Sequence, residues 1–163
     1  MRTLTSACLT LFLALFLAGP AAAQTVDLGC AITDKTEARA DACAAFVGCF
    51  TGSGTYFTGR AIGWNSGTLA AETSEGVFCT GTWQNTGGLK PPTASFECDN
   101  GESGLVVYTH QDPRTGTATG SGVTDRFRRV EIWSGNNIRQ FLADETGEID
   151  PKLMCGDAEI PIS

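Results

Sequence analysis

Apolar and polar positions alternate along two nearby segments, residues 77–83 and 94–98, which predicts a β-hairpin with one apolar and one polar face. A shift of the pairing by one residue would destroy both faces, so the pattern fixes the register. The register that keeps one face apolar makes three cross-strand pairs: Trp83 with Ala94, Gly81 with Phe96, and Cys79 with Cys98.

This register brings Cys79 and Cys98 close enough to bond, and we predict a disulfide between them. In the chain-entropy model such a bond contributes about 3 kcal/mol to the free energy of unfolding. Phe96 is expected to cover Gly81, which has no side chain of its own.

The remainder of residues 51–163 has the same β character, rich in glycine and threonine, with turn signals every eight to twelve residues. No interval is long enough for a crossover helix, so the strands are expected to be antiparallel. We predict a mainly β domain of seven or eight strands, either a barrel or a sandwich, followed by a C-terminal tail. A second hairpin is expected between residues 127–133 and 138–142, joined at Gly135 and Asn136.

Two different segments precede this domain. Residues 1–23 combine a basic start, an apolar run and three alanines, and predict a cleaved signal peptide. Residues 24–50 are expected to form a short helical head that a disulfide ties to the body, because Cys43, Phe46 and Phe50 recur near one side at helical spacing. An export signal before a glycine- and threonine-rich β body is typical of small exported bacterial proteins, so we predict a periplasmic or secreted protein without a transmembrane anchor.

Cysteine content agrees with export to an oxidising compartment. Loss of Cys8 with the signal peptide leaves six of the seven cysteines, and this even number predicts three disulfides. Cys155 is expected to pair with the segment 24–50, and the other pairings stay open. No zinc-knuckle spacing occurs, and we expect neither a metal nor a cofactor. The cysteines of the mature chain are Cys30, Cys43, Cys49, Cys79, Cys98 and Cys155.

The charge of the chain and its candidate chemistry favour binding over catalysis. The net charge of −7 argues against nucleic acid. The lone basic cluster, which consists of Arg126, Arg128 and Arg129, is expected to be solvated surface, with an anionic partner as the alternative.

Four acidic residues within 144–150 could hold calcium but depart from the EF-hand pattern. A relay of Ser103, His110 and Asp112 would require contact between the two ends of one strand, roughly 23 Å apart.

The first functional hypothesis is a noncatalytic binding module of the bacterial envelope, including an inhibitor of or adaptor for another envelope or secreted protein. Its partner would be a protein or a glycan. The alternative is a small glycan hydrolase that uses a carboxylate pair, with Glu97 and Asp99 on the polar face of the hairpin and Glu72 on a neighbouring strand. The missing catalytic motifs favour the first hypothesis and leave enzymatic activity uncertain.

Overall fold

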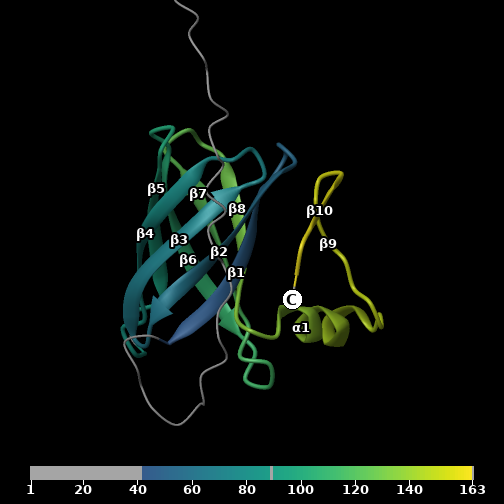
Figure 1. The fold of residues 1–163 in the computed structure, drawn as a ribbon. Coiled ribbons are helices and arrows are strands. Elements are labelled where there is room, and N and C mark those ends of the chain that lie inside the picture. Colours follow the sequence, from purple (N-terminus) through teal and green to yellow (C-terminus); the bar gives the residue numbers. More distant parts are fainter. Residues whose placement is uncertain (1–41, 89, 163) are drawn as a thin grey trace, which may run out of the picture.

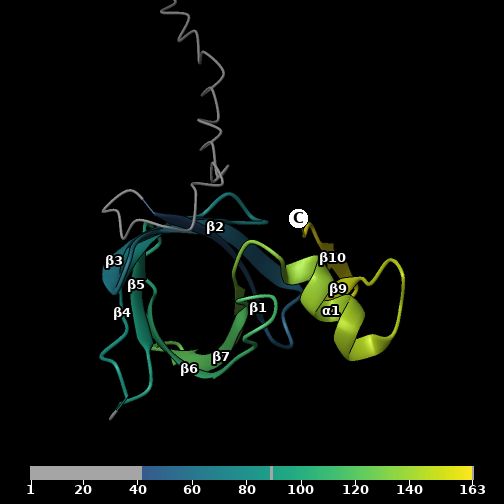
Figure 2. The same cartoon turned by 90° about the horizontal axis from the view of Figure 1, so that it is seen from below.

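The computed structural model describes residues 42–88 and 90–162, which form a closed antiparallel β-barrel with a small appendage (Figure 1). Each of the strands β1 to β7 pairs with the next one along the chain, and β8 returns to pair with β1. Figure 2 shows this ring from below, with the appendage on its outer side beside β1. The barrel strands are β1 (Cys43–Phe50), β2 (Thr55–Gly63), β3 (Ser66–Thr73), β4 (Phe78–Gln84), β5 (Thr93–Cys98), β6 (Ser103–Gln111), β7 (Ala118–Thr124) and β8 (Arg129–Ser134).

The predicted hairpin is confirmed pair by pair between β4 and β5. Trp83 lies opposite Ala94, Gly81 opposite Phe96, and Cys79 opposite Cys98. The Cys79–Cys98 disulfide is formed. Of the two architectures left open by the sequence, the barrel is the one adopted.

Residues 43–50 are not part of a helix, and the prediction is wrong for this part of the segment 24–50. They form β1, which pairs with β2 and β8. The spacing of Phe46 and Phe50 satisfies both a helix and a strand, because four residues are about one helical turn and two strand periods. Both rings lie in the barrel core. Residues 1–41, which include the predicted signal peptide, the start of the helical head and Cys30, lie outside the described residues.

The second predicted hairpin is also wrong. Residues 138–142 lie in helix α1 (Ile138–Thr146), because both edges of β8 are already occupied by β7 and β1. Gly147 ends the helix in the left-handed conformation, with φ 74°, and its N–H donates to the carbonyl of Ala143. None of the helices in the described ranges is long and apolar enough to span a membrane.

Aromatic rings that lie over glycines fill the interior of the barrel. A Cβ on Gly104 would lie 2.5 Å from the ring of Phe96, so this ring covers Gly104 on β6 and not Gly81 as expected. The ring of Phe57 occupies the space beside Gly48 in the same way. The buried residues around these rings are Phe46, Phe50, Leu69, Ala71, Ala94, Val106, Val130 and Ile132.

A second apolar cluster attaches the appendage to the outside of the barrel. Helix α1 and the hairpin of β9 (Leu153–Cys155) and β10 (Ala158–Ile160) bury Val47 and Cys49, which lie on the outer face of β1. The Cys49–Cys155 disulfide joins the two parts. The expectation that Cys155 ties back to residues 24–50 is therefore confirmed. Cys43 is disulfide-bonded as well.

Candidate functional site

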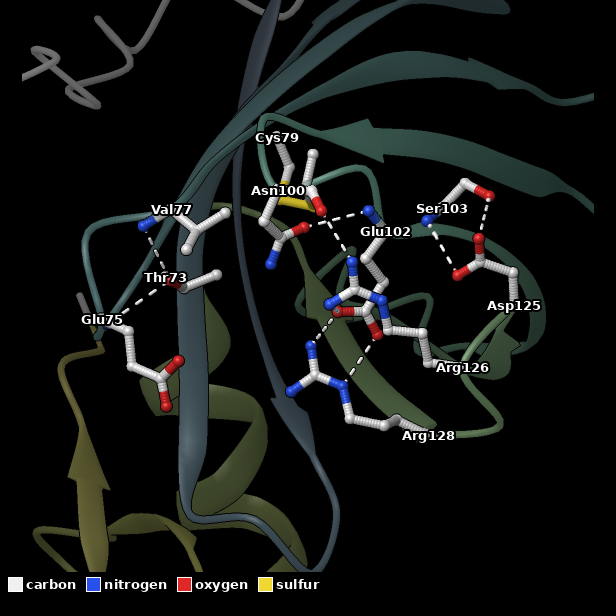
Figure 3. Close-up of a disulfide and its surroundings, with 11 residues drawn as sticks. Thr73, Glu75, Val77, Cys79, Asn100, Glu102, Ser103, Asp125, Arg126 and Arg128 are labelled. Atoms are coloured by element: carbon white, nitrogen blue, oxygen red, sulfur yellow. Dashed lines mark hydrogen bonds and ion pairs between the residues drawn. A yellow bond between two sulfur atoms is a disulfide. The ribbon is translucent and has the colours of Figure 1, made fainter.

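One end of the barrel, here called the sealed end, is closed by a buried ion pair (Figure 3). The turns 51–54, 74–77, 99–102 and 125–128 lie at this end, which is at the top of Figure 1. Glu102 is 1% exposed, and its carboxylate accepts hydrogen bonds from Nε of Arg128 at 2.7 Å and from Nη2 of the same residue. The guanidinium of Arg128 lies 3.9 Å from the ring centroid of Phe50.

The surroundings of Glu102 favour its charged form. The hydrogen bond from Arg128 is the main cause of a lowered pKa, and it outweighs the burial that would raise the pKa. The hydroxyl of Thr124 and the charge of Arg126 act in the same direction as Arg128. Glu102 is therefore a buried and charged partner of Arg128 at this end of the barrel. The basic cluster is thus only partly the solvated surface that the sequence predicts.

The opposite end, here called the open end, holds a depression of about 1040 Å³. It is formed where β1, β2, β4, β6, β7 and β8 meet the loops at 64–65, 85–92 and 112–117. Its volume is at the upper limit of ordinary small-ligand sites. The aromatic, proline and polar side chains that line it include Trp64, Trp83, Pro91, Pro92, Tyr108, Ser134, Asn65, Asn85, Lys90, His110 and Gln111.

Two aromatic side chains form the base of this depression. Trp83 and Tyr108 pack against the barrel core, and the indole N–H of Trp83 donates to the carbonyl of Ile62 at 3.2 Å. The side chains of Tyr108 and Ser134 are hydrogen-bonded to each other. Burial raises the pKa of Tyr108 to about 12, although the hydrogen bond to Ser134 acts in the opposite direction. The phenol therefore stays neutral at ordinary pH, and the base offers flat apolar surface with one hydroxyl pair.

A separate apolar cavity of about 30 Å³ lies within the barrel core. Core side chains such as Phe46, Phe96 and Ile132 line it, and its described lining contains no charged residue. A space of this size holds no more than about one water-sized sphere. Of these two spaces, the depression at the open end is the one large enough for a small ligand.

The carboxylates proposed for glycan hydrolysis do not line the depression. Glu97 lies on β5 opposite Thr80 and Ser103, and its side chain is exposed. Glu72 lies two strands away on β3, with β4 between them. The N–H of Asp99 is bonded to the carbonyl of Phe78, and its side chain is exposed in the turn after β5. The structure does not bring these three residues into one concave site.

The relay of Ser103, His110 and Asp112, which the sequence argues against, is not assembled. Ser103 donates its hydroxyl to Asp125 at 3.2 Å, while Asp112 accepts the hydroxyl of Thr115 at 2.6 Å. His110 is exposed at the open end, with its ring 6.5 Å from the ring of Phe141.

The acidic segment 144–150 is used in ion pairs. Asp144 pairs with Arg114, and Asp150 pairs with Arg139. No group of three or more His, Cys, Asp or Glu side chains within the described ranges is placed to hold a metal ion.

Comparisons with known proteins add little to this description. No protein-family model matches the chain, and no curated protein matches it. A solved structure that is similar in fold is a de novo designed fluorescence-activating β-barrel, with 10% sequence identity and a TM-score of 0.46. The match covers 58% of this chain and 91% of the designed one.

Proposed function

We propose that the protein is an exported, noncatalytic binding module whose ligand site is the open end of the barrel. The observation that carries this proposal is the difference between the two ends. Glu102 and Arg128 close one end, whereas Trp83 and Tyr108 form an apolar base beneath a wide opening at the other. A barrel of eight strands has an interior that is either filled by side chains or holds one small ligand. Here the interior is filled by core side chains, and the depression lies at the open end.

The groups at the open end support binding rather than turnover. Catalysis by proton transfer or nucleophilic attack needs a base within hydrogen-bonding reach of its partner. Tyr108 is paired with Ser134 and stays neutral, and the acids of the proposed hydrolase lie elsewhere on the barrel wall. Export is supported by the predicted signal peptide and by the Cys49–Cys155 and Cys79–Cys98 disulfides, which persist in oxidising compartments.

The proposal is tested with 8-anilinonaphthalene-1-sulfonate, an apolar dye that becomes fluorescent when it leaves water. We expect saturable binding of one dye per protein at neutral pH. Trp64 is 56% exposed at the rim and Leu105 is 52% exposed on the outer wall, so these residues make a matched pair. Trp64→Ala should weaken binding about fivefold or more, because an aromatic contact is lost, and Leu105→Ala should not. Equal effects of the two substitutions, or no saturable binding, would overturn the proposal.

A role as an inhibitor or adaptor for another protein is the second candidate, and Phe127 favours it. Its side chain is 91% exposed in the turn at the sealed end, and it is the described non-glycine residue with positive φ, 61°. Exposed aromatic anchors on rigid turns are common at protein interfaces. A photocrosslinking residue at position 127, introduced in the producing cell, should capture one protein that the same residue at Val123 does not. The captured protein, once purified, should bind Phe127→Ala about tenfold more weakly than wild type. Equal capture from both positions, or unchanged affinity, would exclude this role.

A further inference from the structure

The charge of the open-end lining differs from that of the whole chain. The chain has 18 acidic and 11 basic residues. None of the acidic residues is among the described residues that line the depression, whereas Lys90 and the chain's single histidine, His110, both are. An acidic protein repels anions over most of its surface. An opening whose described lining has no acidic side chain is therefore a place where an anion can approach at lower electrostatic cost.

Among the described residues, the acidic group nearest to the lining along the chain is Asp112, which follows Gln111 at the end of β6. Its Oδ2 atom accepts both the backbone N–H of Thr115, at 2.8 Å, and the Thr115 hydroxyl, at 2.6 Å. In the same turn Arg114 pairs with Asp144 of α1. The charges of Arg114 and Asp144 thus offset each other, and the Asp112 carboxylate is held within its own turn by Thr115. Lys90 is the basic side chain of the described lining.

From this arrangement, and resting on the proposed function, we propose that the open end binds a free anionic amphiphile. Its flat or apolar body would lie on Trp83, Tyr108 and the prolines 91 and 92, and its carboxylate or sulfonate would lie at the rim beside Lys90. Lys is a compact donor of three hydrogen bonds and suits a single anionic group on a mobile ligand. We place a monomeric ligand here rather than a membrane surface, because the lining is concave.

Two isosteric ligands that differ in charge test this assignment, naphthalene-2-carboxylate and naphthalene-2-carboxamide, with binding measured by calorimetry at neutral pH. We expect the carboxylate to bind about tenfold more tightly than the amide. Lys90→Gln should remove that difference and leave the affinity for the amide unchanged. Lys152→Gln is the matched control, because it removes the same charge from an exposed lysine that is paired with Glu159 on the outer hairpin.

The outcomes separate this inference from the proposed function. Equal affinity for both ligands, or no change with Lys90→Gln, would overturn the anionic assignment and leave the binding module intact. Failure of both ligands to bind would overturn the two proposals together. Sedimentation with vesicles of phosphatidylglycerol and phosphatidylcholine adds a further arm. We expect the protein to stay in the supernatant, and vesicle binding without naphthoate binding would assign the surface to a membrane instead.

Discussion

The guanidinium of Arg128 donates two hydrogen bonds to the buried carboxylate of Glu102, and the same guanidinium lies over the ring of Phe50. The pair joins the turn after β5 to the turn before β8, and these turns are neighbours because β6 pairs with β7. Its buried carboxylate and the guanidinium over Phe50 lie inside this end of the barrel.

Replacing Glu102 with glutamine should destabilise the fold. The variant keeps the shape of the side chain but leaves Arg128 without a charged partner in a mostly buried position, which costs about 3–5 kcal/mol when burial is complete. Because 31% of the Arg128 side-chain surface is still exposed to solvent, we expect a value near the lower limit of this range. The free energy of unfolding should fall by about 3 kcal/mol. Urea unfolding measures it. A loss below about 0.5 kcal/mol would show that the pair does not stabilise the sealed end.

The same carboxylate should make stability depend on acid pH. Its pKa is lower in the folded protein than the value of about 4.3 for the unfolded chain, so the unfolded state binds more protons in this range. The contribution of Glu102 is therefore fully present above that unfolded pKa and is lost as the pH falls through the lower folded pKa. Urea unfolding from pH 6 to pH 2 should show a steeper loss for the wild type than for Glu102→Gln. If wild type and Glu102→Gln lost stability in parallel as the pH falls, Glu102 would not be the origin of the pH dependence.

Gly104 should not tolerate even one methyl group. A Cβ at this position would meet the ring of Phe96 at 2.5 Å, and overpacking of this kind costs about 1–3 kcal/mol. The shorter side chain in Phe96→Leu should relieve the clash, so the cost of Gly104→Ala should be smaller in that background. A double-mutant cycle measures the coupling between the two positions. Additive effects would show that this ring does not set the requirement for glycine.

The positive φ of Phe127 should make its replacement by asparagine more favourable than its replacement by alanine. Its φ of 61° is unfavourable for most side chains, and its ring is exposed. Asparagine adopts this region readily, whereas alanine retains most of the strain. We expect Phe127→Asn to be more stable than Phe127→Ala by about 1 kcal/mol in thermal or urea unfolding. Equal stability of the two variants would mean that the turn relaxes.

Predictions that rest on the alternation of apolar and polar residues within strands are correct. Predictions that depend on how the barrel closes are wrong. The register of β4 and β5 follows from local pattern alone, so Cys79 and Cys98 could be paired correctly. The spacing of Ile138, Phe141 and Leu142 fits a helix better than a strand, and Gly147 is a helix stop. The turn signal at Gly135 predicts a hairpin instead, because nothing local shows that β8 has partners on both edges.

The candidate site was missed for a related reason. Trp83 and Tyr108 each occupy an inward position near the end of a strand, where the sequence shows only core residues. Their role as the base of an opening appears once β4 and β6 are placed in one ring with a sealed opposite end. The ion pair of Glu102 with Arg128 was equally hidden, because 26 residues separate the partners.

The most direct test of the account uses the three tryptophans of the chain. Two of them, Trp64 and Trp83, line the open end, while Trp133 packs in the outer cluster beneath α1. Their indole N–H signals can be followed in a ¹H–¹⁵N spectrum during titration with naphthalene-2-carboxylate. The account predicts that the signals of Trp64 and Trp83 shift in a saturable way and that the Trp133 signal does not. A shift of Trp133 alone, or no shift at saturating ligand, would contradict it.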